Sequence, residues 1–303
     1  MITYRCDIFV NGDISLPRDR GRELAATFAD SLERLPVGYA VRVGPSAPEY
    51  VPLISAAEAA GRAVLVGSGT ADEPVAVELA LGAEAPMPAD PGPLLDPVFG
   101  IGAGFWTSGT TGNPRLVLHT YQALSYQAEA TASLLRFSSV RWGVSLPLDH
   151  AYGYSVANLA RTFGSELHWF SPTSTKKLAR SLAAGELDTL DTIPRMWKFI
   201  LDLARRDPAV MRGLRGLLLR GVGGQLLAPN LALAFEQADA PLNDGYGLTE
   251  AGPNVAINVS ASYESGSVGR PLPGTELRVV EGELLSEKPV GLSVAMAKWA
   301  CMQ

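Results

Sequence analysis

The segment Phe99-Gly-Ile-Gly-Ala-Gly-Phe-Trp-Thr-Ser-Gly-Thr-Thr-Gly-Asn-Pro-Arg115 joins an apolar run to a loop of small, hydroxyl-bearing residues. Small side chains let backbone N–H groups approach phosphate oxygens, and the threonine and serine hydroxyls supply further hydrogen-bond donors. Arg115 adds a permanent positive charge at the end of the loop. The segment therefore predicts a phosphate-binding loop, with an ordinary glycine-rich turn as the alternative that further motifs must exclude.

On both sides of this loop, apolar β-branched runs alternate with amphipathic stretches. Strands are expected at residues 40–43, 63–66, 144–146, 166–170 and 217–219, and a helix is expected at residues 48–60. Such alternation is typical of an α/β fold with parallel strands. The loop would then be one of several turns that follow a strand.

A proline-rich stretch suggests how the chain is divided. Prolines at positions 86, 88, 91, 93 and 97 exclude regular structure there, and we interpret the stretch as a connector. It would separate an N-terminal α/β subdomain, residues 1–98, from a central α/β subdomain, residues 99–253. Helical periodicity is lost beyond the central part, so residues 254–303 are expected to form turns and short strands.

The overall composition narrows the functional classes. With 47% hydrophobic and 18% charged residues, the 303-residue chain can bury a full core. Its net charge of -6 provides no basic surface for nucleic acid or an anionic membrane. The N-terminus is charged where a signal peptide is apolar, and no run reaches the roughly 18 apolar residues of a membrane span. Cys6 and Cys301 lack metal-site or disulfide spacing. We therefore expect a cytoplasmic protein without nucleic-acid or membrane partners.

Other functional motifs fail on spacing. The interval from Gly109 to Gly112 is too short for a P-loop, and no Gly-Lys-Ser/Thr follows it. Neither Gly100-Ile-Gly102 nor Gly221-Val-Gly223 leads to the final glycine of a dinucleotide-binding fingerprint. Gly153-Tyr-Ser-Val-Ala157 lacks the last glycine of a hydrolase nucleophile elbow. These alternatives are therefore disfavoured.

Further segments follow the loop in a recognisable order. They are Leu146-Pro-Leu-Asp-His-Ala-Tyr-Gly-Tyr154, Gly221-Val-Gly-Gly-Gln-Leu226 and Asp244-Gly-Tyr-Gly-Leu-Thr-Glu250. Together with the loop they resemble the motifs of the adenylate-forming superfamily, which includes acyl-CoA synthetases, firefly luciferase-like enzymes and the adenylation domains of peptide synthetases. The loop signature usually ends in Pro-Lys, and Arg115 keeps that charge. The resemblance implies the large domain of that fold, with two layered, mostly parallel sheets, helices and a small β-rich C-terminal element.

The resemblance also implies a nucleotide site, with ATP and Mg²⁺ as cofactors. The phosphate loop would hold ATP at Thr107, Ser108, Gly109, Thr110, Thr111 and Gly112. The rest of the nucleotide would lie against Gly223, Gly224, Gln225, Asp244, Gly245, Tyr246, Gly247 and Thr249. Tyr246 would stack on adenine, because the flanking glycines clear a face for the base. Thr249 would bond the α-phosphate, and Glu250 would hold magnesium.

The acid substrate is expected beside His150, which the resemblance places against the substrate carboxylate. Further acyl-pocket residues would be Ala151, Gly153, Val222 and Gly223. A lone histidine is more often a satisfied core residue, but this one lies between a strand and a glycine-bearing helix start. The candidate catalytic residues are Thr249, Glu250, Arg115 and His150.

The sequence says less about the identity of the acid than about the nucleotide site. Peptide-synthetase domains usually carry an aspartate that pairs with the substrate amine at the start of the acyl-pocket helix. Asp149 adjoins His150, but the surrounding pattern is closer to acyl- and aryl-acid enzymes. An aryl or short acyl acid is therefore the preferred substrate, with coenzyme A or a carrier protein as acyl acceptor.

The resemblance ends near residues 282–285. Family members continue with an aspartate that binds the ribose, a hinge, and a small C-terminal domain that brings a lysine over the reacting groups. Attack of a carboxylate on ATP brings negative charges together, so that lysine matters for the rate. The expectation is slow activation of a carboxylic acid as an acyl-adenylate, or completion by a C-terminal domain on a separate protein. The alternatives are a pseudo-ligase scaffold that binds a nucleotide or acyl group, and a repurposed site acting on an already activated acid.

Overall fold

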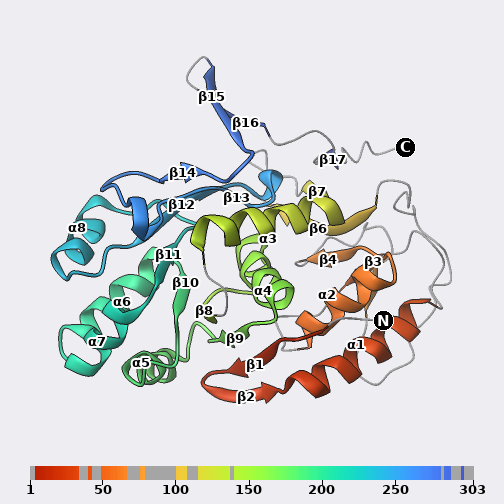
Figure 1. Cartoon of the computed structure of the whole chain (residues 1–303), viewed down its shortest axis with the longest axis horizontal. Coiled ribbons are helices and arrows are strands. Elements are labelled where there is room, and N and C mark those ends of the chain that lie inside the picture. The colour runs from red at the N-terminus through yellow and green to blue at the C-terminus, as the bar shows by residue number, and fades with distance from the viewer. Residues whose placement is uncertain are drawn as a thin grey trace.

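The computed structural model describes residues 4–33, 40–42, 49–66, 76–78, 100–107, 115–136, 140–280, 283–287 and 295–296. They form an α/β fold built on a nine-stranded sheet, a six-stranded sheet and a short two-stranded sheet (Figure 1). Helix α4 (Ala151–Phe163) packs on the nine-stranded sheet and α3 (Tyr121–Leu135) packs on the six-stranded sheet. The two helices contact one another, so they lie between the sheets. The α/β class with two layered, mostly parallel sheets is confirmed.

The nine-stranded sheet is parallel at its centre and antiparallel at both edges. Its order is β14 (Arg270–Pro271), β13 (Asn254–Ile257), β12 (Asn243–Gly247), β11 (Leu219–Val222), β10 (Thr189–Thr192), β8 (Arg141–Val144), β9 (Glu166–Trp169), β1 (Asp7–Val10) and β2 (Asp13–Leu16). All neighbours from β12 to β1 pair in parallel. The carboxyl ends of the central strands therefore meet along one edge of the sheet.

The strand order reverses between β8 and β10. After β8 the chain passes through α4 to β9 on one side of β8. After β9 it passes through α5 (Thr175–Ala183) to β10 on the other side of β8. Such a reversal separates the two connections at the carboxyl ends of the strands and opens a crevice there.

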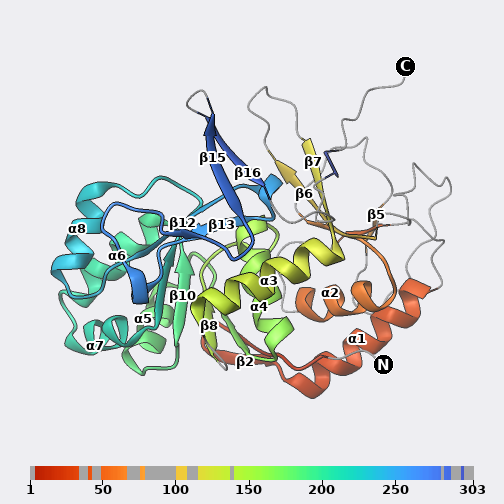
Figure 2. The same cartoon turned by 45° about the horizontal axis from the view of Figure 1, so that its top comes forward.

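The six-stranded sheet contains the strands on either side of the predicted phosphate loop. Its order is β17 (Ala295–Met296), β7 (Arg115–Thr120), β6 (Ile101–Thr107), β4 (Val64–Val66), β3 (Ala40–Arg42) and β5 (Ala76–Glu78). Strands β6 and β7 are antiparallel, and Thr107 pairs with Arg115. The hairpin of β15 (Glu276–Val280) and β16 (Glu283–Glu287) stands apart from both large sheets (Figure 2).

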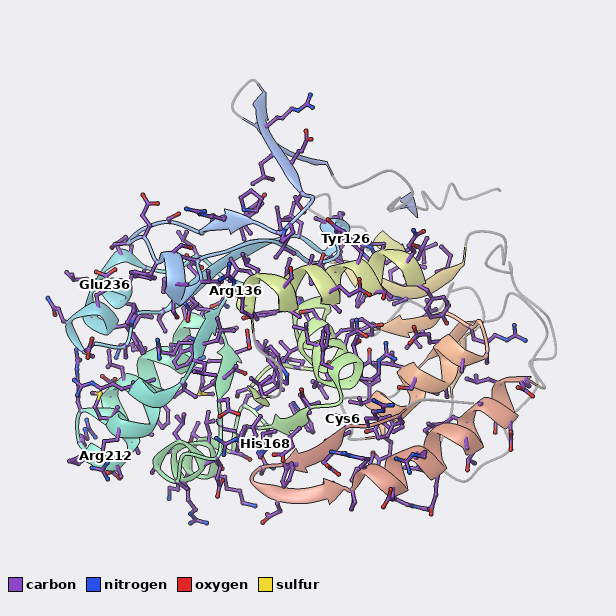
Figure 3. The ribbon with its side chains drawn as sticks, in the orientation of Figure 1. Cys6, Tyr126, Arg136, His168, Arg212 and Glu236 are labelled. Carbon is purple, nitrogen blue, oxygen red and sulfur yellow. The ribbon has the colours of Figure 1, made fainter. Side chains whose placement is uncertain are left out.

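The N-terminal segment is divided between the two sheets. Strands β1 and β2 lie at the edge of the nine-stranded sheet, whereas β3, β4 and β5 lie in the six-stranded sheet. Phe9 of β1 stacks on His168 of β9 with ring centroids 4.2 Å apart, which ties β1 to its neighbour (His168 is labelled in Figure 3). The expected connector at residues 86–97 lies outside the described residues, and the subdomain boundaries at 98 and 253 stay predictions.

The element boundaries agree with the sequence in the strongly periodic parts. Helix α2 (Tyr50–Ala59) and strands β3, β4 and β9 lie where they were expected. The strand expected at 144–146 instead ends at Val144 as β8. The strand expected at 217–219 begins at Leu219 as β11, because Leu217 caps helix α7 (Pro208–Gly216) and Leu218 is half exposed. A short apolar run does not reveal where its strand begins.

Two main groups of buried side chains form the core. One fills the space between the sheets and includes Phe105, Trp142 and Tyr154. The other lies under α5, α6 (Pro194–Ala204), α7 and α8 (Pro229–Gln237), where Trp197 packs edge-on against Phe235 with ring centroids 5.6 Å apart. None of the helices in the described ranges is both long and apolar enough to span a membrane.

The contact between α5 and α7 gives a test of the packing. A Cβ on Gly213 would overlap the Leu182 carbonyl oxygen, so Gly213→Ala must push the helices apart. We expect it to lower the free energy of unfolding by about 1–3 kcal/mol, the usual cost of overpacking. Gly216→Ala is the matched control, because a Cβ there meets no described atom within 4 Å. Urea denaturation of both variants measures the difference, and equal losses would contradict this packing.

Candidate functional site

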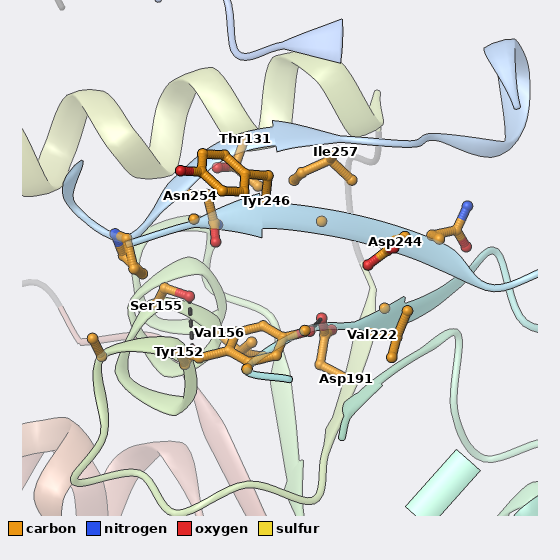
Figure 4. A pocket seen from close by; sticks show the side chains of 18 of the residues that line it. Thr131, Tyr152, Ser155, Val156, Asp191, Val222, Asp244, Tyr246, Asn254 and Ile257 are labelled. Carbon is orange, nitrogen blue, oxygen red and sulfur yellow. Dashed lines mark hydrogen bonds between the residues drawn. The ribbon is translucent and has the colours of Figure 1, made fainter. Parts of the chain in front are cut away.

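A cavity of about 630 Å³ opens at the carboxyl ends of β8, β10, β11 and β12 (Figure 4). It lies where the strand order reverses, the usual place for a ligand in an open α/β sheet. Helices α3 and α4 close one side through Thr131, Leu135, Ser155 and Val156. Segments widely separated in the sequence therefore meet at a single concave site.

Most of the predicted site residues that the structure describes line this cavity. They are Thr107, His150, Ala151, Val222, Gly223, Gly224, Gln225, Asp244, Gly245, Tyr246, Gly247, Thr249 and Glu250. Ser108, Gly109, Thr110, Thr111 and Gly112 lie outside the described residues, as does the side chain of Arg115. Because Thr107 lines the cavity and pairs with Arg115, the predicted phosphate loop starts and ends beside it.

Helix α4 points its N-terminus toward the site. His150 is the N-cap residue, and its Nδ1 accepts a 3.5 Å hydrogen bond from the Tyr152 backbone N–H. In the neutral tautomer with its proton on Nε2, that nitrogen can donate a hydrogen bond to a carboxylate oxygen. The helix dipole adds partial positive charge at the same place. This end of the cavity is suited to an anion.

Gly153 packs against the turn after β8 and does not line the cavity. It is buried in α4 and is not among the described residues that line the cavity. A Cβ at Gly153 would overlap the Pro147 carbonyl oxygen, so glycine allows the turn after β8 to lie close to the helix. Gly153 thereby supports the position of His150.

The segment after β12 brings Thr249 and Glu250 to the cavity as part of η2 (Thr249–Ala251), a short 3₁₀-helix. Nε2 of the buried His119, on β7, lies 2.7 Å from the Thr249 carbonyl oxygen and donates to it in the tautomer protonated at Nε2. This bond joins the six-stranded sheet to the site. His119 was not expected at the site from the sequence, because nothing local relates it to a residue far along the chain.

A buried carboxylate forms part of the cavity wall. Asp191 on β10 accepts a 2.8 Å hydrogen bond at Oδ1 from the Tyr152 hydroxyl. Its Oδ2 is also buried and has no hydrogen-bond partner among the described residues. Burial raises the pKa of Asp191 from 3.8 to about 6, although the hydrogen bond from Tyr152 opposes the shift. Burial and the Asp191 charge raise the pKa of the Tyr152 phenol as well.

The glycines of the 221–224 segment make room for this pair. Gly221 lies beside Asp191 in the parallel register of β10 and β11, and a Cβ there would overlap Oδ1. A Cβ on Gly223 would lie 3.1 Å from the Tyr152 ring. Neither Asp191 nor Tyr152 was expected at the site from the sequence. The signal for Asp191 was a charged residue inside the otherwise uncharged run Thr189-Leu-Asp-Thr-Ile193.

The charge in the cavity is negative. Among its described lining residues, acidic side chains are present at Asp191, Asp244 and Glu250, whereas lysine and arginine are absent. Burial raises the pKa of Asp244, partly offset by a hydrogen bond from the Gly245 backbone. A polyanionic ligand would therefore need cations from the 108–115 segment, from a metal ion or from another domain.

Within the described part of the chain, no group of three or more His, Cys, Asp or Glu side chains is arranged to hold a metal ion. A nucleotide-bound Mg²⁺ does not need one, because it usually takes one or two protein carboxylates together with phosphate oxygens and water. Glu250 at the cavity wall fits that role.

Comparisons with known proteins agree with this architecture. Residues 23–293 match the AMP-binding enzyme family. A 2-succinylbenzoate–CoA ligase of Haemophilus influenzae is 27% identical over 194 residues, covering 64% of this chain and 40% of that ligase. The chain thus matches less than half the length of this curated relative.

Solved structures show the same fold. An o-succinylbenzoate coenzyme A synthetase of Bacillus subtilis in complex with AMP has a TM-score of 0.73 at 16% identity, covering 96% of this chain and 85% of that one. A malonyl-CoA ligase with methylmalonyl-CoA and AMP bound has a TM-score of 0.75 at 23% identity, covering 96% of this chain and 69% of that one. The resemblance to adenylate-forming enzymes is confirmed.

The raised pKa of Asp191 predicts a pH-dependent stability. The folded chain holds the proton more tightly than the unfolded chain, so the free energy of unfolding should fall as pH rises from 3.8 to about 6. Asp191→Asn removes this titration and should be more stable than the parent by about 2–3 kcal/mol at pH 7.5. Urea denaturation from pH 4 to pH 8 measures the profile.

Asp188→Asn is the matched control. Hydrogen bonds from Arg141 lower the pKa of Asp188, so its stabilising effect is present at neutral pH and is lost as pH falls. This variant should be less stable than the parent at pH 7.5 and approach it in acid. Destabilisation of Asp191→Asn at neutral pH would show that Asp191 has a compensating partner.

Proposed function

This chain belongs to the AMP-binding enzyme family, and on that basis we propose that its cavity binds ATP and a carboxylic acid and joins them as an acyl-adenylate. The observation that carries the proposal is the convergence of three motif segments on one cavity. The residues after β8, β11 and β12 meet where the strand order reverses, beside the two ends of the phosphate loop.

The nucleotide would occupy the part of the cavity formed by β11, β12 and η2. Tyr246 lines this part and would stack on the adenine ring, with residues 223–225 along its edge. Thr249, whose backbone His119 holds, would donate its hydroxyl to the α-phosphate. Glu250 would hold Mg²⁺, which neutralises phosphate charge when it is bound.

The acid would lie beside the N-terminus of α4. His150 and the helix dipole would orient its carboxylate, since both present positive charge or a donor to an anion. A carboxylate oxygen would then attack the α-phosphorus and form the acyl–phosphate bond. The bond from that phosphorus to the bridging oxygen would break, with pyrophosphate leaving. No net proton transfer is needed in this step.

The negative cavity makes added cations important for the rate. Arg115 at the end of the phosphate loop is one candidate, and a lysine-bearing domain in the same polypeptide or on a partner protein is another. The names of the relatives are consistent with an aryl or short acyl acid as substrate and coenzyme A as acyl acceptor. The same shortage of described cations favours the second candidate function, a scaffold that binds a nucleotide without converting it.

The two ends of the nucleotide can be tested separately. Tyr246→Ala should weaken ATP, AMP and adenosine by a similar factor, roughly 5- to 100-fold, because stacking does not depend on phosphate number. Tyr246→Phe keeps an aromatic ring and should retain the affinity. Arg115→Ala should weaken ATP more than adenosine, since it removes a charge from the phosphates. Isothermal titration calorimetry measures each affinity. Equal losses for all ligands in both alanine variants would mean that the nucleotide is placed wrongly.

The reaction itself is tested by ATP–pyrophosphate exchange over a panel of acids. Glu250→Gln should lower any exchange by about a hundredfold or more, because magnesium would lose a protein ligand near the developing charge. Adding a lysine-bearing C-terminal domain from a related ligase should raise the exchange rate. Nucleotide binding without exchange in any combination would favour the scaffold, and exchange indifferent to Glu250 would contradict the proposed mechanism.

A further inference from the structure

Asp191 is an unusual component for a cavity that takes an acid. The residue is 6% exposed, it lines the cavity, and its Oδ2 has no hydrogen-bond partner among the described residues. Buried polar atoms are nearly always hydrogen-bonded, and a buried charge is normally paired. The described lining contains no lysine or arginine that could pair with Asp191. A ligand in the cavity is placed to supply that partner, because Oδ2 belongs to a residue of the cavity wall.

The surrounding residues hold the carboxylate in this position. Tyr152 donates to Oδ1 at 2.8 Å, which leaves Oδ2 as the oxygen without a partner. Gly221 provides the space that Oδ1 occupies, and the Trp197 indole N–H donates to the Gly221 carbonyl oxygen at 2.9 Å. The clearance at Gly221 and the hydrogen bond from Tyr152 together fix where the carboxylate lies. The arrangement has the features of a binding group held ready for a ligand.

The chemistry of Asp191 selects among ligands. A carboxylate accepts hydrogen bonds, so Oδ2 requires a donor. An ammonium group supplies both donors and the opposite charge, and charge-assisted hydrogen bonds are the stronger kind. A hydroxyl would leave the charge uncompensated, and a second carboxylate would be repelled. An ammonium group is therefore the best match.

The position of Asp191 relative to His150 adds a further constraint. Tyr152 lies between them, because its backbone N–H donates to His150 and its hydroxyl donates to Asp191. One tyrosine residue thus contacts both His150 and Asp191, through its backbone at one end and its hydroxyl at the other (Tyr152 and Asp191 are labelled in Figure 4). Asp149, which was weighed from the sequence as an amine-binding residue and set aside, is not among the described residues that line the cavity.

We propose that Asp191, positioned by Tyr152, recognises an ammonium group on the acid substrate, so that the chain acts on short or aryl amino acids. The proposal rests on the proposed function for the carboxylate end. It also separates this chain from relatives named for 2-succinylbenzoate, because a dicarboxylate would place negative charge near Asp191.

Matched pairs of acids test the proposal by direct binding. In each pair a methyl group replaces the ammonium: 4-aminobutanoate with pentanoate, β-alanine with butanoate, and 3-(aminomethyl)benzoate with 3-ethylbenzoate. Calorimetry with the intact chain and saturating AMP should show that at least one amino acid binds about 10- to 100-fold more tightly than its partner. 2-Succinylbenzoate should bind more weakly than that amino acid.

Variants show whether the Asp191 carboxylate causes the preference for the amino acid in each pair. Asp191→Asn should abolish the preference for the amino acid while AMP affinity is retained. Tyr152→Phe keeps the charge and should reduce the preference without abolishing it. Asp202→Asn makes the same substitution on the exposed surface of α6, outside the cavity lining, and should leave the preference unchanged. A role limited to stability would not alter the ratio of affinities within a pair.

The outcomes separate this proposal from the proposed function. Equal binding within every pair, or a preference that survives Asp191→Asn, overturns the amine proposal. Pyrophosphate exchange with acids that lack an amine, and not with amino acids, overturns it while supporting the ligase function. Failure to bind AMP argues against the ligase function, whereas an Asp191-dependent preference measured without AMP would still support the amine proposal.

Discussion

The reversal of strand order between β8 and β10 is the constraint on which the site depends. Because β9 lies on one side of β8 and β10 on the other, the connections after β8 and β9 diverge. The carboxyl ends of β8 and β10 are thereby left open to a ligand. The parallel pairing of β10, β11 and β12 then brings Asp191, the 221–224 segment and residues 244–250 to the same edge. No one of these segments forms the cavity by itself.

The carboxylate of Asp191 connects stability with function. Its burial disfavours the charged form, so the fold is less stable with Asp191 ionised than with a neutral group in its place. A buried charge that destabilises the fold can be offset by a bound ligand of opposite charge. Ionisable groups with perturbed pKa values are accordingly concentrated at functional sites. The glycines at 221 and 223 have a related role, because they provide the space that the Asp191–Tyr152 pair occupies. The buried Asp191 carboxylate thus lowers the stability of the fold, and in return it gives the cavity wall a group that can discriminate between ligands.

Local sequence patterns predicted what depends on local chemistry. Helix α2 and strand β9 followed from apolar periodicity, and the motif segments were located because they are contiguous. The features that could not be predicted depend on contacts between residues far apart in the sequence. The parallel partner of β1 is β9, more than a hundred residues away in the chain, and no local pattern specifies that choice. His119 was missed for the same reason, since its partner Thr249 lies far along the sequence. Asp191 carried a local signal as a charge in an uncharged run, but that signal does not identify Tyr152 as its partner.

A crystal structure of the chain with AMP and magnesium would test the central claim most directly. We predict the adenine ring on Tyr246, beside residues 223–225, and the α-phosphate at Thr249, with the acid-binding end of the cavity between His150 and Asp191 still open. AMP bound away from the carboxyl ends of β10, β11 and β12, or adenine occupying the space beside Asp191, would contradict it.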